Sequence, residues 1–312
     1  MLVALLLVMI ALSVGIAVNG LQLDAQIDQQ ILWQLRLPLV GSAILVGASL
    51  AVSSALLQVM LRNPLADPGL IGITSGASLF AAIYLLLGGA SLAGFASYGL
   101  PLFSFLGALQ STFLIHAIAR RLGLDSGAGV ILAGIAISTL GGGVIAWLYF
   151  LADAQSLRNL TFWLLGSLHQ ADLLLVSLTL LPVCGLIGYA MMQGQALNWL
   201  YFGGQAAQVA GLDVKAFYPR MLLISALLVG IAVSLAGSIA FIGLLVPHLL
   251  RNLFGHDNRF ILPASAMTGA ILLLMVVWVS GAFGGVAVPV SMLTATLGGP
   301  VFLYSVIRLA KH

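Results

Sequence analysis

The chain has 312 residues, of which 62% are hydrophobic and only 6% are charged, with a formal net charge of +3. Because soluble domains carry about a quarter charged residues, this composition indicates an integral membrane protein. The few scattered charges exclude the basic surface of a nucleic-acid-binding protein. The single cysteine, Cys184, can form no internal disulfide, and we expect it to pack as a small hydrophobic residue.

Apolar runs bounded by polar, Gly or Pro breaks predict an all-α fold of about ten membrane-spanning helices. Runs of this length suit helices, because barrel strands need about 10 residues of alternating character. The first run, which lacks a basic leading region and a cleavage site, predicts a retained helix rather than a signal peptide. The expected spans are residues 1–19, 38–61, 69–88, 98–118, 128–151, 172–193, 217–236, 239–254, 261–281 and 288–309.

The connection between the second and third spans has a distinctive sequence. Residues 39–61 carry no charge, and Arg36 and Arg62 bound this run. Pro64 and Pro68 then flank Asp67, which predicts a tight polar turn at the membrane surface. Further along the chain, the three consecutive glycines 141–143 weaken the fifth span, so we expect a bend or a backbone that faces a pore there.

The distribution of Lys and Arg predicts the orientation in the membrane. Nine of the 11 basic residues fall in the even-numbered connections or after the last span, and the other two are Arg36 and Arg158. Basic residues accumulate on the cytoplasmic side, so both termini are expected in the cytoplasm. The nine are Arg62, Arg120, Arg121, Lys215, Arg220, Arg251, Arg259, Arg308 and Lys311.

Signatures of catalysis are absent from the sequence. There is no phosphate-binding G-x-x-x-x-G-K-[ST] motif, no Glu, and no Cys/His cluster for a metal, so we expect no enzyme activity, no cofactor and no metal site. All eight Asp fall in connections or at span ends, which counts against a proton- or sodium-coupled carrier. We expect structural or interfacial roles for His116 and His248 rather than metal binding.

The longest internal connection, residues 194–219, is the natural docking point for a cytoplasmic partner that supplies energy. Its sequence predicts two short helices, at 205–210 and 214–218, with Gly211 ending the first. An ordinary amphipathic loop is the alternative, and spacing alone leaves the choice open.

Several motifs together resemble the permease subunits of type II ABC importers, the FecCD family, which takes up ferric siderophores, haem and vitamin B12. They occur in the family's order and cover essentially the whole chain. The matching segments are residues 36–38, 61–69, 72–77, 132–136, 162–167, 202–211, 236–251, 255–259, 262–263, Pro289 and 294–302.

The resemblance implies one permease domain over residues 1–312, folded like the vitamin B12 importer permease. It also implies three kinds of partner: a second permease subunit, a dimer of ABC ATPases, and a periplasmic or lipoprotein substrate-binding protein. The cytoplasmic gate would be Asn63, Pro64 and Leu65, and Arg36 would dock the binding protein. The periplasmic gate would be Phe162, Trp163, Gly166 and Ser167, and the ATPase-coupling residues would be Gly203, Gln205, Ala207, Gly211 and Leu212.

The chain also departs from the family pattern at docking positions. Leu39 replaces a second arginine, Val276 and Ser280 stand where an Asp and an Arg are usual, and Ala287 replaces an acidic residue. The resulting interpretation is an inner-membrane permease for an iron chelate, a ferric siderophore first and haem or cobalamin next. The alternatives are a carrier or channel that works alone, and a degenerate subunit with a structural role.

Overall fold

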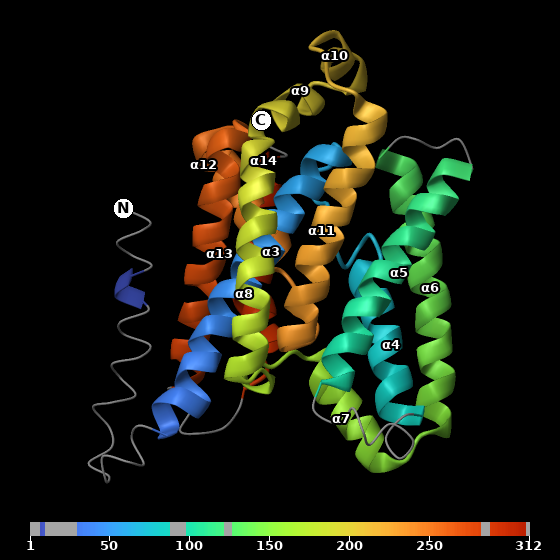
Figure 1. Cartoon of the computed structure of the whole chain (residues 1–312), viewed down its shortest axis with the longest axis vertical. Helices are drawn as coiled ribbons and strands as arrows, with labels where there is room; N and C mark the ends of the chain where they lie inside the picture. The colour runs from blue at the N-terminus through green and yellow to red at the C-terminus, as the bar shows by residue number, and fades with distance from the viewer. Residues whose placement is uncertain (1–6, 10–29, 88–97, 122–126, 282–287, 310–312) are drawn as a thin grey trace.

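The computed structural model describes residues 7–9, 30–87, 98–121, 127–281 and 288–309. Within these ranges the protein is a bundle of helices and contains no strand (Figure 1). The predicted all-α membrane fold is therefore confirmed. The first expected span, 1–19, lies outside the described residues except for positions 7–9.

The helices follow one another with short connections. Small helices lie before α3, between α6 and α8, and between α8 and α11. In order they are η1 (Leu32–Arg36), α3 (Leu37–Met60), α4 (Ile73–Leu87), α5 (Gly99–Arg121), α6 (Gly127–Leu151), α7 (Ala154–Leu164), η3 (Leu168–Gln170), α8 (Leu173–Met192), α9 (Gly194–Tyr201), α10 (Gly204–Val209), α11 (Val214–Ala236), α12 (Ile242–Phe254), α13 (Asn258–Gly281) and α14 (Val290–Leu309).

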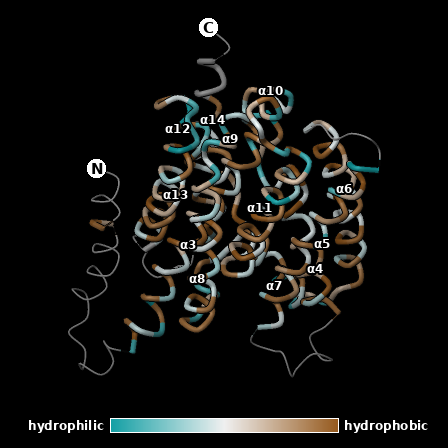
Figure 2. Tube along the Cα trace, turned by 45° about the horizontal axis from the view of Figure 1, so that its top comes forward, coloured by the Kyte–Doolittle hydropathy of each residue, from teal (hydrophilic) through white to brown (hydrophobic). Residues whose placement is uncertain are grey.

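Every expected span from the second to the tenth coincides with one of these helices. In the described part of the chain, six helical stretches are long and apolar enough to cross a membrane, and α4 and α12 are shorter apolar helices. Hydrophobic residues run along the whole bundle, whereas hydrophilic ones gather around α9, α10 and the nearby helix ends (Figure 2).

Helix α3 forms the centre of the bundle and is buried along almost its whole length, in contact with α8, α11, α12 and α13. A Cβ atom on Gly47 would overlap the carbonyl of Gly269, so small residues let α3 and α13 meet backbone to backbone. The Ser53 and Ser225 hydroxyls lie 2.6 Å apart and join α3 to α11. Close packing and polar contacts thus replace the hydrophobic driving force that lipid does not provide.

A second group of helices, α4, α5 and α6, lies beside this core (Figure 1). A Cβ on Gly76 of α4 would overlap Ser111 of α5, and one on Gly134 of α6 would overlap the carbonyl of Ile71. The glycine-rich patches in the sequence are therefore packing contacts at these positions.

Helices α4 and α12 are shorter than the expected spans. At 1.5 Å per residue their 15 and 13 residues reach about 22 and 20 Å, less than the ~30 Å of hydrocarbon. Non-helical residues 61–72 and 237–241 precede them, with positive φ at Arg62, Gly72, Gly237 and Phe241. Irregular backbone is tolerated at membrane depth only where protein buries it or a cavity receives it.

Four expectations from the sequence need correction or refinement. Helix α6 runs without interruption through glycines 141–143, and a Cβ on Gly142 or Gly143 would meet nothing within 4 Å, so a backbone that faces a pore there stays a prediction. Cys184 is exposed on α8 rather than packed inside the bundle. The segment 194–219 contains an additional helix, α9. It was not expected because only one residue, Gln193, separates it from α8, so the sequence does not mark it as a separate helix. The short helix expected at 214–218 is the first part of α11, which continues through Pro219.

Candidate functional site

Residues 61–72 leave the end of α3 in a tight turn; we call them the gate segment because they contain the three expected gate residues. Arg62 has a φ of 49°, and the Asn63 amide donates to the Gln58 carbonyl, which ends the helix. The Asn63 side chain accepts from the Leu65 amide at 2.9 Å. Pro64 and Leu65 consequently lie exposed at the tip of the turn. The three expected gate residues therefore share one small, rigid turn.

Asp67 lies deeper in the gate segment than the sequence indicated. Its carboxylate accepts from the Gly69 amide at 2.8 Å. A Cβ on Gly243 of α12 would lie 3.0 Å from the Asp67 Oδ2 atom and would overlap the Ser54 hydroxyl of α3. Burial raises the pKa of Asp67 to about 6. The carboxylate is thus wedged between α3 and α12, a position that only the packing of α12 creates.

Three chain segments meet at the opposite end of the bundle, where α7 lies. We call this hydrogen-bonded junction the knot, although the chain is not threaded through itself there. The Ser167 amide donates to the Ala236 carbonyl at 2.8 Å, and the Val290 amide donates to the Gly166 carbonyl at 3.1 Å. The Ser291 hydroxyl donates to the Ser238 carbonyl at 2.9 Å. The end of α7, the end of α11 and the start of α14 are therefore tied together.

The expected periplasmic gate residues occupy different positions around this knot. Gly166 has a φ of 70°, and a Cβ there would lie 2.7 Å from the Ser238 carbonyl oxygen, so only glycine fits. Trp163 is buried, whereas the Phe162 side chain is 56% exposed. Trp163, Gly166 and Ser167 thus build the knot, and Phe162 is the member of the group that faces outward.

The expected coupling residues surround helix α10, which stands at the far end from α7 (Figure 1). Gly203 and Gly211, with φ of 115° and 92°, fix the turns on either side of α10. The Leu212 amide donates to the Ala207 carbonyl at 2.9 Å, and Ala207 is buried. Gln205 and Val209 are exposed, and the exposed fraction of Val209 is 91%.

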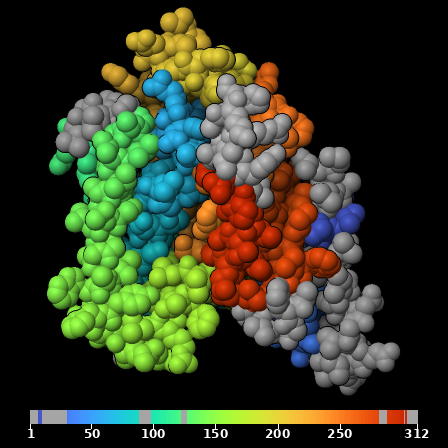
Figure 3. Space-filling view, turned by 180° about the vertical axis from the view of Figure 1, so that it is seen from behind, coloured from blue at the N-terminus to red at the C-terminus, as the bar shows by residue number. Residues whose placement is uncertain are grey.

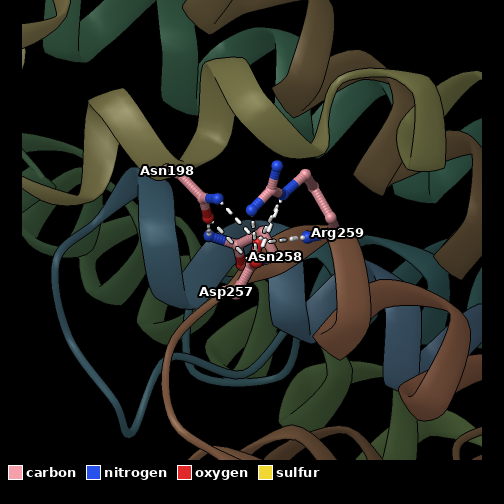
Figure 4. Close-up of polar contacts among 4 residues, drawn as sticks. All are labelled: Asn198, Asp257, Asn258 and Arg259. Carbon is pink, nitrogen blue, oxygen red and sulfur yellow. Dashed lines mark hydrogen bonds and ion pairs between the residues drawn. The ribbon is translucent and has the colours of Figure 1, made fainter.

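A polar cluster joins α9, which carries α10, to the start of α13 (Figure 4). The Asn198 Nδ2 donates to Asp257 Oδ1 at 2.8 Å, and Asn198 Oδ1 accepts from both the backbone and side-chain amides of Asn258. Arg259 forms an ion pair with Asp257 at 2.8 Å. Hydrogen bonds from Arg259 and Asn198 hold the pKa of Asp257 well below its usual range. Sequence reasoning missed this cluster, because Asn198 lies 60 residues from Asn258.

Buried Arg251 extends this cluster toward the gate segment. Its Nη2 donates to Asn258 Oδ1 at 3.0 Å and to the Ala55 carbonyl at 3.2 Å, and its Nε donates to Gln58 Oε1 at 3.3 Å. Gln58 is the residue whose carbonyl receives the Asn63 amide. A continuous set of hydrogen bonds therefore links α9, α13, α12 and the end of α3.

Arg36, the expected docking residue, is half-buried at the start of α3, on the α7 side of the bundle. The pKa of His169 in η3 is lowered mainly by burial and also by the positive charge of Arg36, which therefore lies near it. The Ser42 hydroxyl of α3 also donates to the Leu168 carbonyl at 3.3 Å, which fixes η3 beside α3. Arg36 and the knot therefore share one end of the molecule.

A hollow on one face lies between the two ends. Figure 3 shows α4 in teal at its floor, between α6 in green and α14 in red. Helix α7 bounds the hollow at one end, and α10 stands beyond the other. The gate segment leads directly into α4, so one candidate gate lies at the α10 end of this hollow. The other candidate gate, which contains the knot, lies at the α7 end.

Comparison with known proteins identifies the family. The sequence profile of the FecCD transport family matches residues 1–308. The chain is 39% identical over 291 residues to the vitamin B12 import system permease protein BtuC of Vibrio cholerae serotype O1, covering 91% of this chain and 85% of that one. It is 41% identical over 278 residues to the hemin transport system permease protein HmuU of Yersinia pestis, covering 88% and 82%.

A solved structure has the same fold. It is an inward-facing transporter assigned to the metal-chelate type of ABC transporters, and it matches with a TM-score of 0.88 and 29% identity over 98% of this chain and 97% of that one. The fold, the sequence profile and the relatives agree, and the chain belongs to the FecCD transport family.

Proposed function

We propose that this chain is the permease subunit of an ATP-driven importer that carries an iron chelate, a ferric siderophore, from the periplasm to the cytoplasm. Haem or cobalamin is the alternative cargo, favoured by the relatives named for hemin and vitamin B12. Family membership carries the proposal. The arrangement of the candidate gates at opposite ends of one hollow supports it.

Energy comes from a separate ATPase dimer that binds around α10. The chain has no phosphate-binding motif of its own. Helix α10 offers an exposed surface that includes Val209, and exposed Phe202 precedes it. ATP binding closes the ATPase dimer, the dimer moves α9 and α10, and the bundle changes the side on which the hollow opens.

A second permease subunit, identical or related, closes the open face of the hollow. Large apolar side chains are exposed along α6, among them Trp147 and Phe150, at 70% and 80%. Two such faces around one passage give a wide path for a large polar ligand. A path of this kind needs no charged groups inside the membrane.

A substrate-binding protein, periplasmic or lipid-anchored, docks at the α7 end through Arg36. An exposed ion pair steers docking more than it adds affinity. In this orientation the α10 end and both termini lie in the cytoplasm of a bacterium, and the chain spans its inner membrane several times. Asn63, Pro64 and Leu65 then form the inner gate, and the knot with Phe162 forms the outer one.

Reconstituted transport tests this function. Proteoliposomes receive the chain, its ATPase and its binding protein, and are offered labelled ferric siderophore, haem or cobalamin. We expect accumulation of the siderophore only with ATP, and none with a hydrolysis-deficient ATPase. Accumulation of haem or cobalamin instead would keep the permease and replace the proposed ligand.

Two other outcomes would contradict the proposal. Uptake by the chain without any ATPase would identify a secondary carrier or channel. ATP hydrolysis without uptake, restored only by adding a different permease subunit, would identify this chain as a structural partner.

A further inference from the structure

A cavity of about 930 Å³ lies at the α10 end, between the gate segment, α5, α10 and α11. Four basic side chains line it: Arg62, His116, Arg120 and Lys215. Among the described residues that line it there is no carboxylate. These groups come from three separate parts of the chain, so the fold brings them together.

Within the described ranges, the Arg and Lys side chains of this cavity form no ion pair. The ion pair found there joins Arg259 to Asp257, elsewhere in the protein. Asp213, two residues from Lys215, does not line the cavity, and its carboxylate accepts from the Ala216 amide at the start of α11. Like charges gathered around one cavity repel each other unless an anion lies between them. The arrangement therefore favours an anionic ligand.

Arg62 is held in this cavity by an unusual backbone. Its φ of 49° is a left-handed conformation at the end of a helix, a position that glycine normally occupies. The Arg62 Nη1 lies 3.6 Å from the point where a Cβ on Gly203 would stand. The positive φ of Arg62 thus accompanies a guanidinium that lies beside Gly203, at the start of α10.

The cavity also has an apolar side, which distinguishes among anions. Ala119 of α5 and Val130 of α6 are buried in its wall, and Phe202, which is 79% exposed, stands at its rim. Arg120 and Lys215 lie at the ends of apolar helices α5 and α11, the level at which lipid headgroups are found. An ionic and apolar lining at this depth matches a phosphodiester joined to glycerol better than free phosphate.

We propose that this cavity binds the headgroup of an anionic phospholipid of the phosphatidylglycerol or cardiolipin class. Basic pockets between transmembrane helices on the cytoplasmic side recognise such headgroups. The bound phosphate neutralises Arg62, Arg120 and Lys215 together. Because the lining includes both the gate segment and α10, the lipid connects these two parts of the chain. This site is additional to the proposed transport function, but its place on the cytoplasmic side rests on the orientation proposed above, and its lining shares Gly203 and Gln205 with the expected coupling residues.

Lipid binding tests the site directly. The purified chain is placed in phosphatidylcholine nanodiscs, and its affinity for added phosphatidylglycerol and cardiolipin is measured, with co-purified lipid counted by mass spectrometry. Each of Arg62→Gln, Arg120→Gln and Lys215→Gln should weaken binding about fivefold, the effect of one basic residue near a membrane surface. Arg121→Gln is the matched control, because Arg121 is exposed next to Arg120 but does not line the cavity. Thermal unfolding of each variant confirms that it is folded.

Three results would overturn the proposal. Equal lipid affinities of the Arg120→Gln and Arg121→Gln variants would show that the cavity does not bind the lipid headgroup. Inorganic phosphate that competes as well as the lipid headgroup would identify a free-anion site. Loss of the lipid on assembly with the ATPase, with cross-links from Arg62 or Lys215 positions to partner carboxylates, would assign the cavity to the ATPase.

Discussion

Asp67 is a residue whose burial has a measurable consequence. Its pKa is raised from 3.8 to about 6, because the carboxylate is buried between α3 and α12. The folded protein therefore holds this proton more tightly than the unfolded chain does. The resulting stabilisation is complete below about pH 4 and is lost as the pH rises through 6.

Asp67→Asn removes the charge and keeps an oxygen that accepts from the Gly69 amide. At pH 8 in detergent we expect the variant to unfold at a higher temperature than the wild type, because its free energy of unfolding rises by up to roughly 3 kcal/mol. At pH 4 this gain in stability should vanish. Asp153→Asn is the control with the opposite sign, since hydrogen bonds from Ser156 and Gln155 lower the pKa of Asp153. A difference between Asp67→Asn and the wild type that does not depend on pH would contradict this account.

At the scale of elements, α10 depends on the two glycines that flank it. Gly211 has a φ of 92°, and a Cβ there would touch nothing within 4 Å. A side chain at this position therefore has space but strains the backbone. The cost of such a conformation is about 1–3 kcal/mol for a residue other than glycine.

Gly211→Val should reorient α10 without disturbing the bundle. In the complex with the ATPase we expect uptake to fall roughly tenfold, in line with this strain, while ATP hydrolysis and co-purification persist. Ala210→Val is the matched control, because Ala210 is exposed and has a φ of −74°. Normal uptake by Gly211→Val, or loss of assembly, would refute a role in coupling.

Much of the helical framework was predictable, because apolar runs and Gly or Pro breaks act locally. The nine spans from the second to the tenth and the end of α10 at Gly211 follow from such signals. The approaches to α4 and α12 were not predictable, since a φ of 72° at Phe241 is unusual for a residue other than glycine and has no local signal in the sequence. The same holds for the knot and the Asn198 cluster, whose hydrogen bonds join residues far apart in the sequence.

For the whole molecule, the account requires the two candidate gates to lie on opposite sides of the membrane. The gate segment and α10 share one end, since Arg62 lies beside Gly203. Arg36, η3 and the knot share the other end. A passage driven from the cytoplasm and loaded from the periplasm needs this polarity, and positive charge in the sequence predicts which end faces inward.

Cysteine labelling measures this polarity directly. In a Cys184→Ala background, single cysteines replace Leu65 and Val209 at the α10 end, and Phe162 and Gln170 at the α7 end, all of them exposed. With a membrane-impermeant maleimide, we expect inside-out vesicles to label only the first pair and right-side-out vesicles only the second. Labelling of the Leu65 and Phe162 positions from the same face, or of the Leu65 and Val209 positions from opposite faces, would contradict the account.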